Sequence, residues 1–221
     1  MEYSILHKAI TLRVTSFVFL LGIFLSVGLS VNAQQWTLSK EKEGILVYTA
    51  ESGSSYKMFK AEMTVETNLH GPVYLLKDAN SVPKWMENIG EFELFGETDA
   101  FHWYSWTGID MPWPVDNRDV VSKQVLRKIK NGYIMDISST PDEMDNREGY
   151  VRLRVSEGFW SFERLPNGKV RVIYQVSAEP TGIPPWIVNL FIVDSPYQTL
   201  LNMREMVKKE PYKSIRLSYL N

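Results

Sequence analysis

The chain has 221 residues, with 24 basic and 26 acidic side chains and a formal net charge of −2. This balance argues against nucleic-acid binding, which needs a strongly basic surface. There is no cysteine, which excludes a disulfide framework and a lipid-modified N-terminal cysteine, so a hydrophobic core must supply the stability. The length suits one domain with a sizeable core after a short leader.

The N-terminal stretch has the pattern of a secretory signal peptide. Lys8 and Arg13 precede an apolar run over 14–31, and small side chains follow as far as Ala33. A membrane anchor is the alternative, because about 18 apolar residues can just span a bilayer. The small residues at the end of the apolar run, and the absence of a cluster of cationic residues directly after it, favour cleavage near Ala33. We therefore expect a signal peptide over 1–33, a domain over 34–221, and an exported protein that is periplasmic or secreted.

The first part of this domain is expected to contain two strands and two short helices. A short capped or helical entry is predicted over 36–43, and strands over 45–50 and 56–66. In the second strand apolar side chains alternate with charged or hydroxyl side chains, the period of a sheet with one wet face. The stretch 71–86 is expected to form the two helices.

From residue 89 onward the pattern is an antiparallel meander with tight turns that contain Gly, Asn or Pro. The expected strands lie near 89–96, 100–107, 118–130, 132–139, 150–156, 158–165 and 169–179. One long helix from about 184 to 209 follows, and Pro196 is expected to kink it. Its apolar side chains recur at three- and four-residue intervals, namely Trp186, Leu190, Val193, Tyr197, Leu200 and Met203.

This order of elements predicts an α+β fold in which a curved antiparallel β-sheet wraps around a long C-terminal α-helix. If the space between the sheet and the helix is too wide for their side chains to fill, a cavity remains between them. A solid core would have the same periodicity, so the sequence pattern leaves both outcomes open.

Three groups of residues carry a resemblance to a known family. They are WTLSK at 36–40 followed by ILVY at 45–48, the Pro-Trp-Pro loop at 112–114 followed by NRDVV at 117–121, and IPPWIVN at 183–189. Together, and in this order, they resemble a START domain over nearly the whole region after the leader. The resemblance implies the helix-grip fold, a tunnel between the sheet and the C-terminal helix, and binding of one lipid or other apolar molecule. It also places the Pro-Trp-Pro loop near the tunnel entrance.

The candidate ligand-binding residues are taken from the central strands, this loop and the C-terminal helix. They are Trp103, Trp106, Met111, Trp113, Arg118, Ser122, Gln124, Trp186, Leu190, Val193 and Leu200. Trp103 and Trp106 are three apart on a strand, so they are expected to face opposite sides with only one in the core. Trp113 either gates the tunnel or plugs the end of the barrel. Trp186 is either a packing anchor or a lid residue.

The sequence allows two interpretations of the role of Arg118. If Lys123 and Arg127 point to solvent, strand alternation places Arg118, Ser122 and Gln124 on the concave face, where they would select the ligand headgroup. Alternatively, Arg118 pairs with a carboxylate such as Asp116 or Asp119, a buried ion pair that costs nearly as much desolvation as it returns.

The sequence therefore favours a noncatalytic lipid-binding or lipid-transfer protein, which binds a lipid or other apolar small molecule. An enzyme of cyclase or hydrolase type in the same cavity is the first alternative. It has little support, because the chain lacks a nucleophile motif and closely spaced metal ligands, and because His70, His102 and the acidic stretch 141–148 are more simply surface residues. A periplasmic partner-binding module with a filled core is the second. We expect a monomer that touches a membrane transiently and needs no cofactor or metal.

Overall fold

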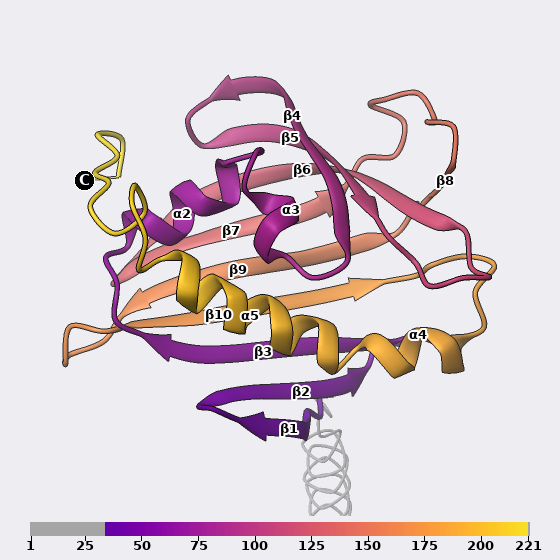
Figure 1. Ribbon diagram of the computed structural model, residues 1–221, viewed down its shortest axis with the longest axis horizontal. Helices are drawn as coiled ribbons and strands as arrows, with labels where there is room; N and C mark the ends of the chain where they lie inside the picture. Colours follow the sequence, from indigo (N-terminus) through magenta and orange to yellow (C-terminus); the bar gives the residue numbers. More distant parts are fainter. Residues whose placement is uncertain (1–33, 221) are drawn as a thin grey trace, which may run out of the picture. The chain divides into compact units, whose positions relative to one another are not determined.

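The computed structural model describes residues 34–220, which form ten strands and four helices (Figure 1). The predicted signal peptide lies outside the described residues. The strands are β1 Thr37–Lys42, β2 Ile45–Glu51, β3 Lys57–Val65, β4 Ile89–Asp99, β5 His102–Ile109, β6 Asn117–Ile129, β7 Gly132–Ser139, β8 Tyr150–Arg152, β9 Ser156–Arg164 and β10 Val170–Ala178. The helices are α2 His70–Lys77, α3 Val82–Trp85, α4 Pro185–Phe191 and α5 Asp194–Met206. In this part of the chain no helix is long and apolar enough to cross a membrane.

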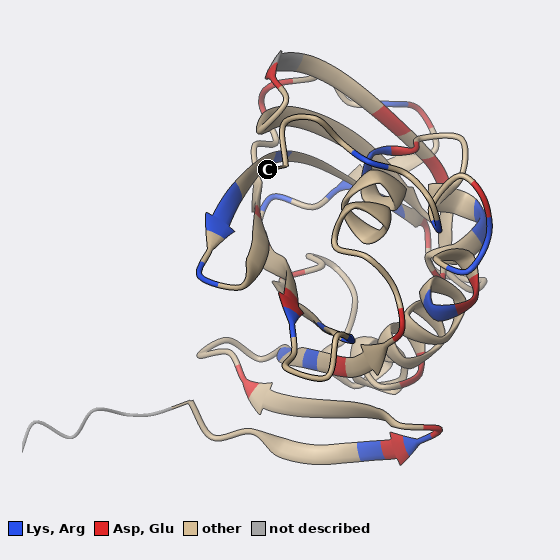
Figure 2. Ribbon diagram, turned by 90° about the vertical axis from the view of Figure 1, so that its left-hand side faces the viewer, with Lys and Arg blue, Asp and Glu red and all other residues tan. Residues whose placement is uncertain are grey.

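The strands form one sheet in the order β1-β2-β3-β10-β9-β7-β6-β5-β4, and all neighbours along this path are antiparallel. The short strand β8 lies off the path and pairs in parallel with the start of β6. Figure 2 shows from one end how the sheet curls around the helices. The predicted α+β architecture, a curved antiparallel sheet that grips the C-terminal helical segment, is confirmed.

Tight turns set the register of the meander. Strand β6 ends opposite the start of β7, where Ile129 pairs with Gly132 across a two-residue turn. A Cβ atom on Gly132 would lie only 1.8 Å from the carbonyl oxygen of Phe162 on β9. Only glycine therefore allows β9 to approach this turn closely.

The first predicted element is wrong, because residues 37–42 form strand β1 instead of a helical entry. Strand β1 pairs with β2 through a two-residue turn at Glu43 and Gly44, whose φ angles are 53° and 72°. Positive φ at both central residues is the signature of the type I′ hairpin turn, which matches the twist of the strands on either side.

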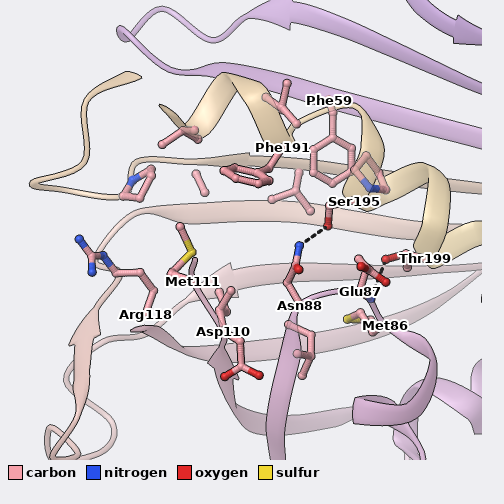
Figure 3. Close-up of a pocket in the computed structure, with 18 of the residues that line it drawn as sticks. Phe59, Met86, Glu87, Asn88, Asp110, Met111, Arg118, Phe191, Ser195 and Thr199 are labelled. Atoms are coloured by element: carbon pink, nitrogen blue, oxygen red, sulfur yellow. Dashed lines mark hydrogen bonds between the residues drawn. The ribbon is translucent and has the colours of Figure 1, made fainter. Parts of the chain in front are cut away.

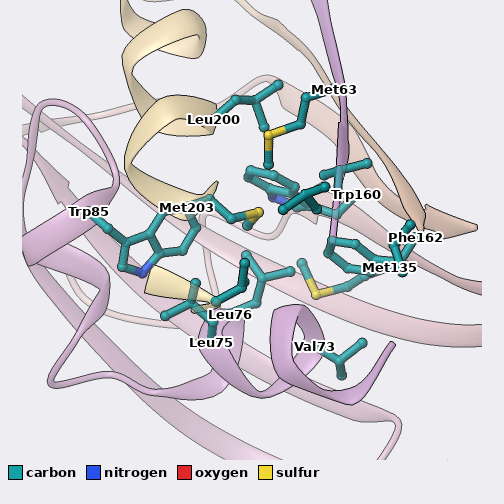
Figure 4. Packing of buried hydrophobic residues seen from close by; sticks show 14 of the residues in the cluster. Met63, Val73, Leu75, Leu76, Trp85, Met135, Trp160, Phe162, Leu200 and Met203 are labelled. Atoms are coloured by element: carbon teal, nitrogen blue, oxygen red, sulfur yellow. The ribbon is translucent and has the colours of Figure 1, made fainter. Parts of the chain in front are cut away.

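The core lies where α5 crosses the concave face of the sheet (Figure 4). Leu200 and Met203 of α5 are fully buried in the same cluster as Met63 of β3, Trp160 of β9 and Trp85 of α3. Burial of one such side chain contributes about 1.5–3 kcal/mol, so this end of the helix is held firmly against the sheet.

The C-terminal helix differs from the single kinked helix predicted over 184–209. It is two helices, α4 and α5, separated at Ile192 and Val193. The ring of Pro196 would clash with the carbonyl of residue 192 in a continuous helix, whereas a proline in the first turn of a new helix loses no hydrogen bond. The proline therefore fixes where α5 begins, and α4 becomes a separate element.

Candidate functional site

A cavity of about 490 Å³ opens beneath α4, between the sheet and the loop that connects β5 to β6 (Figure 3). Most of its wall is apolar, with Phe59 from β3, Met86 from the α3–β4 connection, Met111 from the loop and Phe191 from α4. Side chains from opposite ends of the sequence therefore meet at one apolar space of the size typical of small-molecule sites, roughly 300–1,000 Å³.

A second, deeper cavity of about 170 Å³ shares a wall with the first. The residues common to both are Met86, Ile89, Ile109, Leu153, Tyr174, Val176 and Ala178. The deeper cavity extends along the concave face to Trp103 and Trp160. We call the space beneath α4 the outer cavity and the deeper space the inner cavity.

Tyr174 stands where the two cavities meet and is held rigidly. Its ring stacks on Trp160 with centroids 3.9 Å apart and an interplanar angle of 7°. Burial raises the pKa of the Tyr174 hydroxyl well above its ordinary value, so this group stays protonated and uncharged at neutral pH.

Strand β6 contributes polar side chains to the walls of both cavities. Arg118 lines the outer cavity, and Ser122 and Gln124 line the inner cavity. The alternation inferred from the sequence holds here, since Val120 also faces the inner cavity and Leu126 lies in the core cluster.

Arg118 is buried, and it donates hydrogen bonds to backbone carbonyls. Nη1 donates to the oxygen of Asp116 at 2.6 Å and Nη2 to that of Thr181 at 3.3 Å, while Nε has no partner. Among residues 34–220 no carboxylate forms a salt bridge with it, so the expected pairing with Asp116 or Asp119 is wrong. In Figure 3 the guanidinium points away from Phe59 and Phe191. Arg118 thus ties together the two loops that border the outer cavity.

Asp119 points to the other face of the sheet, where it forms a buried ion pair with Arg152. Nε and Nη2 of Arg152 donate to its two carboxylate oxygens at 3.0 and 2.9 Å. Arg152 also donates to the backbone oxygens of Pro141, Met144 and Asp145. This pair therefore holds the 141–148 segment, expected to be a solvated loop, against the outer face.

The expectation that only one of Trp103 and Trp106 is buried is also wrong, because both are buried. They do face opposite sides, and Trp103 lines the inner cavity. Trp106 lies on the outer face, where Nε1 donates to Asp119 at 2.7 Å and the indole packs against Tyr150 and Arg147. The 141–153 segment thus provides a second buried layer, and Trp106 lines neither cavity.

Three of the proposed site residues lie at the surface near the outer cavity. Trp113 is 93% exposed, Trp186 67% and Leu190 63%. Trp113 sits between Pro112, a wall residue of the outer cavity, and Pro114. An exposure of 93% rules out the reading of Trp113 as a plug, and the exposure of Trp186 argues against a packing anchor.

The other candidates divide between wall and core. Met111 lines the outer cavity, whereas Val193 and Leu200 pack in the core and line neither cavity. Sequence reasoning missed much of the apolar wall. The missed residues include Phe59, Met86, Ile89, Leu153, Tyr174, Val176, Val188, Phe191 and Ile192. On β10 the alternation of Val172, Tyr174 and Val176 could have indicated the inward face.

Comparison with known proteins agrees with this architecture. The family model of the START domain matches residues 26–209. The chain belongs to the START domain family. A protein described as uncharacterized, PA1579 of Pseudomonas aeruginosa, is 32% identical over 180 residues, which cover 80% of this chain and 89% of that protein.

Solved START structures superpose over most of the described chain. A STAR-related lipid transfer protein from Xanthomonas axonopodis (fragment 25–204) is 33% identical, with a TM-score of 0.73, and the match covers 79% of this chain and 99% of that one. Human STARD10 is 20% identical, with a TM-score of 0.70 and coverage of 80% and 74%. The second likeness shows the fold alone. The START assignment makes this a hydrophobic ligand-binding fold.

Proposed function

We propose that this START domain is a noncatalytic carrier that binds one lipid or similar apolar molecule in the joined outer and inner cavities and moves it between membranes. The outer cavity, about 490 Å³ with a mainly apolar wall, is the observation that carries the proposal. The cavity also argues against the alternative of a partner-binding module with a filled core.

The physics of such a carrier separates uptake from selection. A lipid in a membrane is already surrounded by hydrocarbon, so moving it into an apolar cavity changes its free energy little, although leaving each CH₂ in water would cost about 0.8 kcal/mol. Apolar walls therefore permit uptake without favouring one lipid. Selection falls to the few polar groups in the wall, which must be satisfied by the ligand.

The placement of the histidines supports a noncatalytic role. His70 and His102 lie outside the walls of both cavities. Nδ1 of His70 accepts the backbone N–H of Leu217, and His102 lies 2.9 Å from the carboxylate of Asp99. Each imidazole thus serves local structure, and neither lies within reach of a molecule in the cavity.

The proposal includes a transient contact with a membrane through the exposed residues Trp113, Trp186 and Leu190. Indole rings favour the headgroup region of a bilayer, where one edge is apolar and the other is wet. All three residues belong to elements that border the outer cavity. Such a contact would bring the cavity mouth to the lipid surface.

We further propose that α4 and the 110–116 loop form the gate. No residue of α4 is buried, although Val188 and Phe191 line the outer cavity. A helix with so little packing separates from its neighbours at low cost compared with α5, so ligand entry needs only local motion.

We propose that the protein is exported, on the basis of the signal-peptide pattern, and that it acts as a monomer. Fractionation of the native cells and size-exclusion chromatography test these two points.

The test of binding is organic extraction and mass spectrometry of protein purified from its native compartment. We expect about one apolar molecule per chain. A matched control is Ala178→Phe, since Ala178 lines both cavities and a phenyl ring there would occupy the space. A clean extract from the wild-type protein, together with no uptake of added lipid, would rule out the proposal.

A further inference from the structure

The far end of the inner cavity carries an uncharged polar pair. Gln124 Nε2 donates to Ser105 Oγ at 2.7 Å. The two residues lie on adjacent strands, β6 and β5, and both are buried, Ser105 at 1% and Gln124 at 5% exposure. The amide oxygen Oε1 of Gln124 has no hydrogen-bond partner. The pair thus leaves one buried acceptor unused at a cavity wall.

An unused buried acceptor is unfavourable in an otherwise apolar setting. Burial of a polar atom without a hydrogen bond costs free energy, and nearly all buried polar groups in native proteins have a partner. Most of the inner-cavity wall is apolar, with Trp103, Val120, Met135 and Trp160 among its residues, and its polar members are uncharged hydroxyl and amide groups. A ligand that donates a hydrogen bond to Oε1 would remove the cost.

The inner cavity also limits the charge of the group that binds there. None of its wall residues is charged, whereas Lys57, Glu87, Asp110 and Arg118 all line the outer cavity. A charged headgroup in the inner cavity would lose its hydration without gaining a counterion, which is prohibitively unfavourable. The complementary group is therefore neutral and carries a donor proton. A hydroxyl is the smallest such group.

We infer that the molecule carried is apolar with one uncharged hydroxyl group, and that it binds with the hydroxyl first, donating to Gln124 Oε1 at the Ser105–Gln124 pair. This inference rests on the proposed carrier function. Gln124 lies six residues from Arg118 on the same strand, roughly 20 Å at about 3.3 Å per residue. The polar end thus lies far from the mouth, and the apolar remainder extends through the inner and outer cavities.

The test is displacement of the uncharged dye Nile red by three probes with the same chain: 1-dodecanol, its methyl ether and dodecanoate. The ether keeps the oxygen but cannot donate a proton. Because the alcohol can donate one neutral hydrogen bond that the ether cannot, we expect the wild-type protein to bind the alcohol about tenfold more tightly than the ether. Dodecanoate should bind more weakly than the alcohol. This ranking requires no variant, so it does not depend on the folding of one.

Two variants locate the effect. Gln124→Met keeps the length of the side chain and removes the acceptor, so the preference for the alcohol should disappear. Gln175→Met is the matched control, because Gln175 lies on β10 outside both cavity walls and should leave the tenfold preference intact. Far-ultraviolet circular dichroism and melting temperature confirm that each variant is folded.

Equal affinities for alcohol and ether in the wild-type protein would overturn the inference. So would tighter binding of dodecanoate that is lost in Arg118→Met, since the polar end would then lie in the outer cavity. Recovery of a native ligand without a hydroxyl group would contradict this inference but would still support the carrier function. Failure of all probes to displace the dye, with a clean native extract, would remove both.

Discussion

The two helices of the C-terminal segment face the same sheet but differ in how they are held. Helix α5 buries Leu200 and Met203 completely, whereas α4 has no buried residue and leaves Trp186 and Leu190 exposed. The solid part of the core lies beneath most of α5, whereas the outer cavity lies beneath α4 and the first turns of α5, which contribute Ser195, Pro196 and Thr199 to its wall. One segment therefore provides both the anchor of the fold and the cover of the cavity, and Pro196 sets the boundary between them.

The most direct way to test this contrast is to truncate one side chain on each helix. Met203→Ala should destabilise the protein by about 2–5 kcal/mol, because it leaves a void in a close-packed core. Leu190→Ala should change stability by no more than about 0.5 kcal/mol, as expected of an exposed site. Urea unfolding followed by circular dichroism measures both. Similar losses in the two variants would contradict the division into anchor and cover.

Arg118 lies at the edge of the covered region, and its replacement tests what holds the bordering loops. Arg118→Met removes the hydrogen bonds to the backbone oxygens of Asp116 and Thr181. It leaves no buried carboxylate without its ionic partner. We expect a loss of roughly 1–2 kcal/mol, and not the approximately 3–5 kcal/mol of a broken buried ion pair. The melting temperature and the profile of bound lipids should be measured on the same sample. A large loss of stability would show that an ionic partner is involved.

A disulfide across the mouth tests whether α4 must move. One cysteine between 109 and 115 and one between 186 and 192, at Cα atoms about 4.4–6.8 Å apart, can be introduced cleanly because the chain has no native cysteine. Oxidation should slow ligand exchange by about tenfold or more, as for a locked lid, and reduction should restore it. Each single-cysteine variant is the control. An unchanged rate in the fully oxidised protein would mean that ligand enters elsewhere.

The exposed tryptophans test the membrane contact of the cover. Trp113→Ala should lower the rate of lipid transfer between vesicles by several-fold, since an interfacial indole contributes on the order of 1 kcal/mol, and should leave the melting temperature unchanged. Trp36→Ala, on the hairpin side of the domain, provides a comparison. Equal transfer rates for Trp113→Ala and the wild-type protein would remove Trp113 from the proposed contact.

The smallest expected effect concerns the packed end of the domain, where His70 accepts the N–H of Leu217 in the C-terminal tail. Burial, aided by the positive charges of Arg216 and Arg164, lowers the pKa of His70 below 6.5. At pH values between the pKa of His70 in the folded protein and its higher pKa in the unfolded chain, the unfolded chain binds more protons. The contribution of His70 to stability is therefore fully present above about pH 6.5 and falls as the pH decreases towards the pKa in the folded protein.

Urea midpoints at several pH values, compared between the wild-type protein and His70→Gln, measure this contribution. The variant should show a weaker fall in stability in that window. Parallel curves for the two proteins would show that other groups cause the pH dependence.

The sequence predicted the strands of the meander because most of them place apolar side chains on the concave face at every second position, a period that can be seen in the sequence. It did not reveal β1, since the charged residues between Thr37 and Lys42 hide the alternation, although Glu43-Gly44 could have indicated the hairpin turn. The break between α4 and α5 was placed too late because Pro196 was read as a kink within a helix and not as part of a first turn.

The site was predicted less completely than the fold, because its walls are built from distant segments. Local alternation correctly oriented Arg118, Ser122 and Gln124 on β6. It could not reveal that the 141–153 segment buries Trp106 on the outer face, or that the α3–β4 connection supplies Met86 and Ile89 to the cavities. These contacts depend on the tertiary arrangement of residues that have no periodic relation in the sequence.

The distribution of the indole rings gives the protein an optical signature. Trp85, Trp103, Trp106 and Trp160 are buried, whereas Trp113 and Trp186 are exposed. Fluorescence emission should therefore contain a blue-shifted component and a red-shifted component that a water-soluble quencher such as iodide removes selectively. Trp103 and Trp160 line the inner cavity, so its occupancy should alter the first component, while association with a bilayer should shift the second. The two steps of a transfer cycle thus have separate native reporters.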